Sequence, residues 1–460
     1  TENVIVTAAG SITSIGGDLV LNSDTDTATS AGGGIRVLGI VTSAGGNITL
    51  GGGADPAVTN AVATAGSDSD GIKIDGGTLD AAAGNISLRG FSAIGDGVEI
   101  QTNAVIQTTS GNVSLQGSST FDDGIALESG AVIETTSGAI TLNGTTTSVS
   151  GDDGIKASDT GTTVTSATGS ISFTGMASTG DGVDISAGAV ISSTSTATIM
   201  IDGTSTAMTE TGVKIRGANT QITSVDGNIT ITGTDNNTAG VFVTTGAEIS
   251  STGTGADAAS ITITGTGDAG IDIISAGTLI TSVDGNILLD GTGNTFEGIV
   301  ITDATISATG TTADAATITL DGVSTANDAV LLRSGSTITS VAGDIQLTGD
   351  ASTATDDGIE LEAGSTVSST GSGAVVASIT LLGTGGTNND GIHIDGSVTS
   401  VDGNIQLAGT TSDADGDDGI DLDVGLIEAT GSGAILLTGN GRTNGIELNS
   451  SITSNSGAIT

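Results

Sequence analysis

Aspartate placed directly before glycine is the most repeated polar feature of this sequence. It stands ahead of a Gly-aliphatic-x-aliphatic segment at Asp70, Asp96, Asp123, Asp357, Asp390 and Asp418. Several of these positions carry further acids, and the acids that we select as candidate Ca²⁺ ligands are Asp122, Asp123, Asp152, Asp153, Asp356, Asp357, Asp413, Asp415, Asp417 and Asp418. Carboxylates stacked about 4.8 Å apart repel each other by roughly 0.9 kcal/mol even in water. A bound Ca²⁺ would relieve this repulsion, because oxygen atoms are its preferred ligands.

The same Asp-Gly pair also has a purely structural interpretation. Asp can cap a turn through its own backbone while Gly adopts a positive φ. The densest cluster, Asp413-x-Asp415-x-Asp417-Asp418, has Asp418 where an EF-hand loop needs Gly and Val424 where it needs Glu. The Gly-Gly-x-Gly-x-Asp repeat of calcium-bound β-rolls does not occur either. We therefore expect that no cofactor is required, with Ca²⁺ as the one candidate ligand.

The composition excludes several classes of partner. The chain of 460 residues has 52 Asp and Glu against 8 Lys and Arg, which gives a formal net charge of −44. Such a surface repels a phosphate backbone and anionic lipid headgroups, so nucleic acid is not an expected partner. The sequence contains no apolar run long enough to span a bilayer, so no membrane insertion is expected. Divalent cations are the natural counterpart of this charge.

Catalysis is not expected from these residue types. The sites of carbohydrate lyases and hydrolases need acids clustered with Arg, Lys or His, and often an aromatic platform for the sugar ring. Here the basic residues are dispersed along the chain, Trp and Tyr are absent and there are 5 Phe. His393 lies between Ile392 and Ile394, at an outward position where a solvated side chain is the simplest interpretation. We predict that the protein is not an enzyme.

These residues recur because the chain is built from an internal repeat. Three elements follow one another: a Gly-aliphatic-x-aliphatic segment such as 71–74, an aliphatic segment with Thr-Ser such as 222–224, and an aliphatic-x-aliphatic segment such as 229–231. The first element recurs in fourteen steps from Gly34 to Gly445, so the mean period is (445 − 34)/14, about 29 residues. The connection from the third element to the next first element varies in length. Insertions confined to one corner are typical of a solenoid.

The three elements are predicted to be short β-strands. Each alternates with period two, is rich in Ile, Val and Thr, and is bounded by Gly, Asp, Asn and Ser. Three strands of about four to five residues in each repeat predict an all-β fold, a right-handed parallel β-helix (β-solenoid) of about 16 coils and roughly 77 Å. The alternative is an antiparallel hairpin around turns such as Asp226-Gly227. Against it, Ala83, Ser110 and Thr168 replace the Asp at equivalent turns with the spacing unchanged.

Stacked coils place equivalent residues in columns. The predicted aliphatic column of the second element includes Ile106, Ile133, Val164, Ile191 and Ile222. An amide ladder is predicted for the asparagines after the corner glycine, which are Asn47, Asn85, Asn112, Asn228, Asn286 and Asn404. Outward Ser and Thr residues fit solvated strand faces. A flat threonine array could order water, as in β-solenoid ice-binding proteins, but Met200, Leu288 and Gln346 interrupt the rows.

We interpret residues 1–460 as one continuous solenoid that forms a segment of a longer chain or filament. The sequence begins directly at a strand-like segment, 4–6, and ends inside an expected strand after Ile459. An open coil is an unpaired sheet edge, and such edges promote association. The expected partner is therefore another copy stacked end to end, or the continuation of the same chain.

The phrases Ile-Thr-Ser-Val-Asp-Gly-Asn-Ile at 222–229 and Ser-Gly-Ala-Ile-Thr-Leu at 137–142 carry a resemblance along the whole chain. They resemble the repeats of large secreted bacterial β-helix adhesins of the filamentous haemagglutinin type and related β-strand-repeat surface proteins. The resemblance implies an extracellular or cell-surface location, a role in attachment or biofilm structure, and cell-surface glycans or receptors as partners. The secretion domain of such proteins is missing from this sequence, which leaves the export route open.

These observations favour a non-catalytic extracellular structural protein, a rod or filament-forming adhesin, stalk or matrix fibre with an acidic edge that faces cations. The alternative is a calcium-dependent surface-layer or biofilm-matrix protein in which that edge cross-links neighbours. A β-helix carbohydrate-active enzyme and an ice-binding protein are remote alternatives. Melting curves with and without EGTA separate the first two functions.

Overall fold

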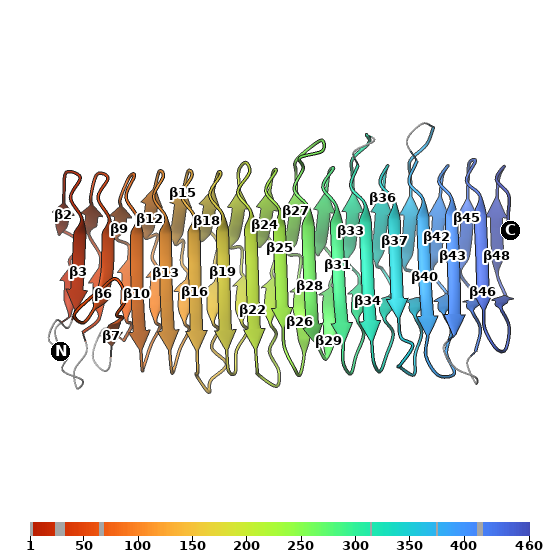
Figure 1. Ribbon diagram of the computed structural model, residues 1–460, viewed down its shortest axis with the longest axis horizontal. Helices are drawn as coiled ribbons and strands as arrows, with labels where there is room; N and C mark the ends of the chain where they lie inside the picture. Colours follow the sequence, from red (N-terminus) through yellow and green to blue (C-terminus); the bar gives the residue numbers. More distant parts are fainter. Residues whose placement is uncertain (1–2, 24–32, 64–68, 313–314, 374–375, 412–416) are drawn as a thin grey trace. The chain divides into compact units, whose positions relative to one another are not determined.

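The computed structural model describes residues 3–23, 33–63, 69–312, 315–373, 376–411 and 417–460. Within these ranges every helix or strand element is a β-strand, and the strands form three parallel sheets of 16 strands (Figure 1). We name the sheets A, B and C in the order in which the chain enters them, and a typical coil gives one strand to each sheet. The prediction of an all-β parallel β-solenoid with three strands in each coil of about 29 residues is thus confirmed. The antiparallel hairpin is wrong, because the described pairings are parallel.

The chain divides into two compact units. Unit 1 contains residues 1–227 and 231–237, and unit 2 contains residues 228–230 and 238–460. Among the described residues, no helix exists that is long and apolar enough to cross a bilayer.

Unit 1 contributes eight strands to each of sheets A and B. Its sheet A strands are β1 (Val4–Val6), β4 (Ile35–Val37), β8 (Ile72–Asp75), β11 (Val98–Gln101), β14 (Ile125–Leu127), β17 (Ile155–Ala157), β20 (Val183–Ser186) and β23 (Val213–Arg216). Its sheet B strands are β2 (Ser11–Thr13), β5 (Ile40–Thr42), β9 (Thr78–Asp80), β12 (Val105–Thr108), β15 (Val132–Thr135), β18 (Thr163–Ser166), β21 (Val190–Ser193) and β24 (Gln221–Ser224). Its sheet C strands are β3 (Leu19–Ser23), β6 (Ile48–Gly52), β7 (Ala61–Ala63), β10 (Ile86–Ser92), β13 (Val113–Ser119), β16 (Ile140–Thr146), β19 (Ile171–Ala177) and β22 (Ile199–Ser205).

Unit 2 repeats the same order, and strand β25 (Ile229–Thr234) of sheet C contains residues of both units. The sheet A strands of unit 2 are β26 (Ala239–Thr244), β29 (Ala269–Ile274), β32 (Ile299–Thr302), β35 (Val330–Leu332), β38 (Ile359–Leu361), β41 (Ile392–Ile394), β44 (Ile420–Leu422) and β47 (Ile446–Leu448). Its sheet B strands are β27 (Glu248–Ser251), β30 (Leu279–Ser282), β33 (Thr305–Ala308), β36 (Thr337–Ser340), β39 (Thr366–Ser369), β42 (Ser397–Ser400), β45 (Leu426–Ala429) and β48 (Ser451–Ser454). Its sheet C strands are β28 (Ile261–Gly267), β31 (Ile287–Gly293), β34 (Ile318–Ser324), β37 (Ile345–Asp350), β40 (Ile379–Gly385), β43 (Ile405–Thr411) and β46 (Ile435–Asn440).

The aliphatic columns fill the interior as predicted. In sheet B of unit 1, Ile106, Ile133, Val164 and Ile191 pair in register from strand to strand, and all four side chains are fully buried. Burying an aliphatic side chain of this size contributes roughly 1.5–3 kcal/mol. Each coil thus depends on the neighbouring coils that cover its interior side chains.

Sheet C strands are longer than predicted, reaching seven residues in β16. They continue for two residues past a buried glycine such as Gly144, which pairs with Gly117 and Gly175 in the adjacent strands. A Cβ atom at Gly144 would overlap the carbonyl oxygen of Gly154 at the start of a sheet A strand. Glycine therefore lets sheets C and A approach closely, which extends the strand beyond the aliphatic pair that marks it in the sequence.

The asparagine ladder is confirmed at the corner between sheets B and C, which we call the B–C corner. The Oδ1 atom of Asn47 accepts a hydrogen bond from the backbone N–H of Asn85 at 3.0 Å, and that of Asn85 accepts one from Asn112 at 2.8 Å. In unit 2, Asn286 and Asn404 accept the same bond from the next coil. These asparagine side chains are exposed.

Candidate functional site

The Asp-Gly pairs lie where the chain passes from sheet C to sheet A, at what we call the C–A corner. In unit 1 these aspartates form a column through successive coils, the unit 1 column, made of Asp70, Asp96, Asp123, Asp153 and Asp181. The unit 2 column is made of Asp328, Asp357, Asp390 and Asp418. Each acid stands two residues before a sheet A strand, so the parallel register of sheet A sets the spacing of both columns.

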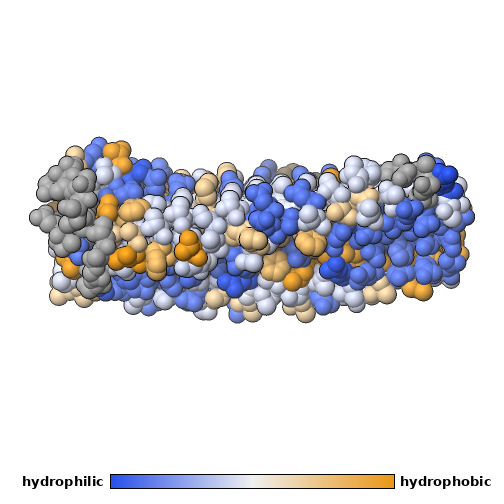
Figure 2. Space-filling view, turned by 90° about the horizontal axis from the view of Figure 1, so that it is seen from below, coloured by the Kyte–Doolittle hydropathy of each residue, from blue (hydrophilic) through white to orange (hydrophobic). Residues whose placement is uncertain are grey.

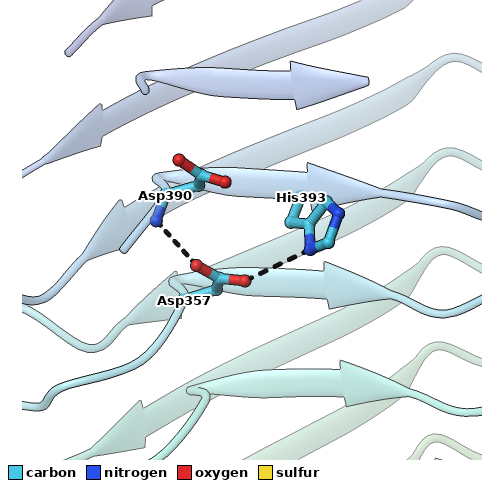
Figure 3. Close-up of side chains that lie close together, drawn as sticks. All are labelled: Asp357, Asp390 and His393. Carbon is cyan, nitrogen blue, oxygen red and sulfur yellow. Dashed lines mark hydrogen bonds and ion pairs between the residues drawn. The ribbon is translucent and has the colours of Figure 1, made fainter. Parts of the chain in front are cut away.

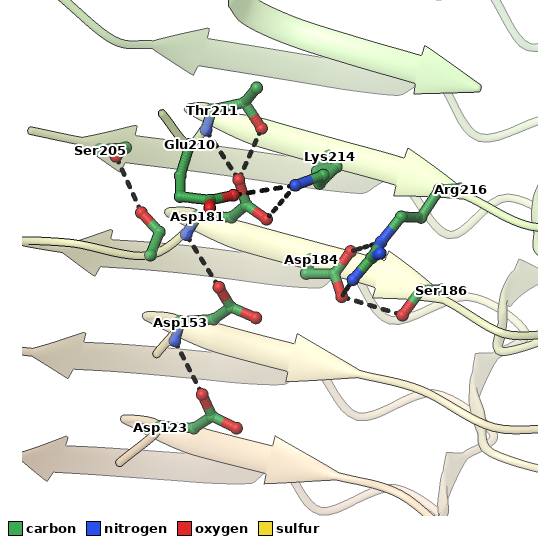
Figure 4. A network of polar contacts seen from close by, with 11 residues as sticks. Asp123, Asp153, Asp181, Asp184, Ser186, Ser205, Glu210, Thr211, Lys214 and Arg216 are labelled. Atoms are coloured by element: carbon green, nitrogen blue, oxygen red, sulfur yellow. Dashed lines mark hydrogen bonds and ion pairs between the residues drawn. The ribbon is translucent and has the colours of Figure 1, made fainter. Parts of the chain in front are cut away.

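Each column is a ladder of hydrogen bonds between coils. The Oδ1 atom of one aspartate accepts the backbone N–H of the residue at the same position in the next coil (Figure 4). In unit 1 the N···O distances are 2.7 Å from Asp153 to Asp123 and 2.8 Å from Asp181 to Asp153. Thr211 continues this ladder by donating to Asp181 at 2.7 Å. A carboxyl oxygen therefore satisfies a backbone donor that packing removes from water.

This arrangement corrects the interpretation of Asp as a cap on its own turn. The N–H that Asp153 accepts belongs to Asp181, which lies in the next coil and not in the same turn. The glycines after the column aspartates do not have a positive φ. Glycine is needed for space instead, since a Cβ atom at Gly124 would overlap the amide nitrogen of Thr145.

Lysines pair with alternate members of the unit 1 column. The Nζ–Oδ2 distances are 3.3 Å from Lys73 to Asp70, 3.6 Å from Lys156 to Asp123 and 3.1 Å from Lys214 to Asp181. Lys73 also contacts Glu99, and Lys214 contacts Glu210. Asp96 and Asp153 lie between these pairs, and neither has a lysine or arginine within ion-pair distance among the described residues.

The pKa values follow this alternation. Burial, together with the neighbouring carboxylates of Asp181 and Asp184, raises the pKa of Asp153 to about 9. Burial likewise raises the pKa of Asp96 well above its usual value. The pKa of Asp123 rises only to about 6, because the Asp153 N–H and Lys156 offset part of its burial. At neutral pH the unit 1 column therefore contains protonated acids between lysine-paired ones.

The unit 2 column has a histidine in place of lysines. His393 Nδ1 lies 3.6 Å from Asp357 Oδ2, and Asp357 accepts the backbone N–H of Asp390 at 2.6 Å (Figure 3). The interaction with the Asp357 carboxylate raises the pKa of His393 to about 9, so the imidazole is a cation at neutral pH. Burial raises the pKa of Asp328 to about 9 and that of Asp390 to about 7. His393 faces outward as predicted, but it is paired with carboxylates and is not simply solvated.

The structure brings some of the predicted calcium ligands together. Oxygen atoms of Asp122 and Asp123 lie within 4.8 Å of one from Asp96, and those of Asp356 and Asp357 lie within 4.8 Å of one from Asp328. No group of this kind includes the other candidates within the described ranges, Asp152, Asp153, Asp417 and Asp418. Asp152 instead accepts a hydrogen bond from Ser148 Oγ. Asp413 and Asp415 lie outside the described residues.

The expected solvent-facing acidic edge is observed only in part. Figure 2 shows the side of the molecule that carries the C–A corners, where hydrophobic side chains lie among hydrophilic ones. Asp123 and Asp357 are buried, while Val149 and Met208 at C–A corners of other coils are more than four-fifths exposed, at 87% and 82%. The column aspartates thus serve mainly as internal ladder groups. Oxygen clusters of this type could hold a divalent cation only if they released their protons and lysine partners.

Sequence reasoning missed the cations of these columns, although a signal was present. Lys73, Lys156, Lys214 and His393 each stand two residues after the glycine of the first repeat element. That position alternates outward on sheet A. From it Lys73 reaches the aspartate of its own coil, and the other three reach the column aspartate of the preceding coil. Considered by repeat position instead of by position along the chain, these four residues are not dispersed.

No known protein-family model matches the sequence, and no curated protein is significantly similar to it.

Proposed function

We propose that this chain is a non-catalytic structural protein that acts outside the cell, as the stalk or matrix part of an adhesin or fibre. The observation that supports this proposal is the regular stacking within each unit, where a typical coil adds one strand to each of three parallel sheets. Each coil contacts mainly its neighbours, so such an array gains length with every repeat. A role as a spacer that holds a binding surface away from a cell fits this geometry.

The outward faces agree with a passive, hydrated surface. Outward positions of the sheet B strands are mostly Ser and Thr, as in β36 and β39. The column carboxyls are used within the stack, where they accept backbone N–H groups. This internal use supports a structural role for these acids.

Length control is the first experiment. Residues 284–341 span two repeats, because Asp284 and Ala342 occupy the same corner position and 342 − 284 is 58. Deleting these residues joins equivalent positions, so the protein should fold and become shorter by about 10 Å, two strand spacings. Small-angle scattering and melting curves measure both effects. As the control, deletion of residues 284–298 removes part of a coil and should disrupt folding. If both deletion variants folded equally well, the proposal that each repeat adds length to a stacked array would be contradicted.

Location is the second experiment. Antibodies against the purified chain should label intact source cells, and added protease should remove the label. Label found only after lysis would contradict the extracellular role.

A calcium-dependent surface layer is the second candidate. The observation in its favour is the gathering of carboxylate oxygens within 4.8 Å around Asp96 and around Asp328. In this case Ca²⁺ should raise the melting temperature and EGTA should reverse the rise. Asp122→Asn and Asp356→Asn should abolish the shift, while Asp226→Asn at the B–C corner should retain it. If the wild-type melting temperature is the same with Ca²⁺ and with EGTA, the calcium-dependent function is contradicted and the structural role remains.

A further inference from the structure

A groove of about 440 Å³ crosses the outer surface of unit 1 where sheet B strands meet the B–C corner. It runs along the stack past strands β9, β12, β15 and β18, so one ligand lying in it would contact several coils. One wall carries Asp80, Gln107, Glu134 and Thr165, which pair in register on consecutive strands. The next outward positions along the chain form the other wall and include Ala82, Thr109 and Ala167.

The two carboxylates of the groove are spaced by the fold. Asp80 and Glu134 are two strands apart, which places them about 10 Å from each other along the stack. Asp80 is held in position, because its Oδ2 accepts Gln107 Nε2 at 2.9 Å and its Oδ1 accepts the Ala82 N–H at 2.9 Å. Glu134 is exposed, and its carboxylate makes no hydrogen bond or ion pair among the residues that the structure describes.

Three of the threonines that line the groove have hydroxyls engaged in hydrogen bonds. Thr109 donates its hydroxyl to the Ala82 carbonyl at 2.9 Å, Thr135 donates to the Gly138 carbonyl at 2.6 Å, and Thr165 shares a hydrogen bond with Ser192 at 2.9 Å. With these hydroxyls engaged, the methyl groups of Thr and Ala line the space between the carboxylates. The groove thus alternates anionic and aliphatic contacts along its length.

We propose that this groove binds a linear aliphatic polyamine whose ammonium groups lie about 10 Å apart. The ammonium groups pair with Asp80 and Glu134, and the methylene chain packs on the threonine and alanine methyls. No Lys, Arg or His lines the groove, so nothing there neutralises the carboxylates or repels a cation. A single metal ion is too small to bridge both acids, and a sugar chain would find no aromatic platform among the lining residues that the structure describes.

Unit 2 contains a matched control for this site. A groove of about 410 Å³ occupies the equivalent place beside β45 and β48, and Glu428 is its one carboxylate. Its register neighbour in the next strand is Thr453. This groove offers one anchor for an ammonium group where the unit 1 groove offers two.

The test is isothermal titration calorimetry of the full chain with spermidine at physiological salt, which screens the diffuse charge of the protein beyond about 8 Å. Glu134→Gln should weaken spermidine binding about fivefold, the upper end for an exposed ion pair, and Glu428→Gln should leave it unchanged. Ethylenediamine, whose ammonium groups are too close to reach both acids, should bind weakly to all three proteins. Melting curves check that the variants are folded. The proposal would be overturned if Glu134→Gln and Glu428→Gln lost the same amount of spermidine affinity. It would also be overturned if the wild-type protein bound spermidine and ethylenediamine equally well.

Discussion

Two corners of the solenoid coils, the B–C corner and the C–A corner, make the same hydrogen bond in different surroundings. At the B–C corner Asn85 Oδ1 accepts the N–H of Asn112 at 2.8 Å, and at the C–A corner Asp153 Oδ1 accepts the N–H of Asp181 at the same distance. The asparagines are exposed, whereas most column aspartates are buried. Stacking thus sets the geometry of the acceptor, and it does so equally at both corners.

Burial decides the chemistry of the acceptor. An amide is neutral at every pH, so the asparagine ladder has no charge to accommodate. A buried carboxylate must be protonated or paired with a cation, because an isolated buried charge is costly. Asp153 takes the first solution and Asp181, beside Lys214, takes the second. The C–A corner should therefore respond to pH and the B–C corner should not.

The largest expected effect is a loss of stability as the pH rises. The folded-state pKa of Asp153 is about 9 against an unfolded value of 3.8, and Asp328 behaves in the same way. The folded protein holds protons that the unfolded chain has released, so this stability is complete below pH 3.8 and is lost as the pH rises toward 9. Urea unfolding should show a decrease of several kcal/mol from pH 5 to pH 9. The double variant Asp153→Asn with Asp328→Asn should flatten the profile, and an unchanged slope would contradict the assignment of these protons.

Removing one acceptor from the buried ladder is the next largest effect. Asp153→Ala leaves the Asp181 N–H without its acceptor, which should lower the free energy of unfolding by about 2 kcal/mol at pH 7. Asp153→Asn retains an oxygen in the same place and needs no proton, so it should lose little. The matched change at the exposed corner, Asn85→Ala, should cost about 0.5–1 kcal/mol because water replaces the amide. Equal losses for the Asn and Ala variants of Asp153 would show that the hydrogen bond is not what this residue supplies.

The third prediction concerns His393, which is the cation paired with Asp357 of the unit 2 column. Its pKa rises from 6.5 to about 9 on folding, so its stabilisation is complete below pH 6.5 and is lost as the pH rises through 9. His393→Gln should therefore lower the stability by about 1 kcal/mol at pH 6, with the two proteins converging above pH 9. His393→Lys places a permanent cation where unit 1 has Lys156, and it should keep the stability beyond pH 9. A glutamine variant as stable as wild type at pH 6 would show that the ion pair with Asp357 contributes nothing.

The fold could be predicted from the sequence because its determinants are local and repeated. The period of about 29 residues and the alternation in segments such as 229–231 specify strands that stack in register. The asparagine ladder could also be predicted from the sequence, because stacked coils are enough to place the asparagine side chains in one column. The role of the aspartates did not, because the N–H that Asp153 accepts belongs to a residue in the next coil and the Asp-Gly pair has a strong local meaning as a turn. The role of the glycine in the Asp-Gly pair could not be predicted for the same reason. Glycine is needed there because sheets C and A approach closely, and this approach is not visible in any single repeat.

The smallest expected effect is the exchange of acceptors at the exposed corner. Asp already occupies this ladder twice, because Asp18 accepts the Asn47 N–H at 2.8 Å and Asp344 accepts the Ser378 N–H at 2.8 Å. Asn112→Asp keeps the oxygen that accepts the Ala139 N–H, and its carboxylate stays in water, where it needs neither a proton nor a lysine. The free energy of unfolding should change by less than about 0.5 kcal/mol, and its slope with pH between 5 and 9 should match that of wild type. Urea unfolding across this range measures both quantities. If this exposed aspartate added a decline with rising pH like that of the C–A corner, then burial would not be what separates the two ladders, and repulsion between stacked carboxylates alone would account for the raised pKa values.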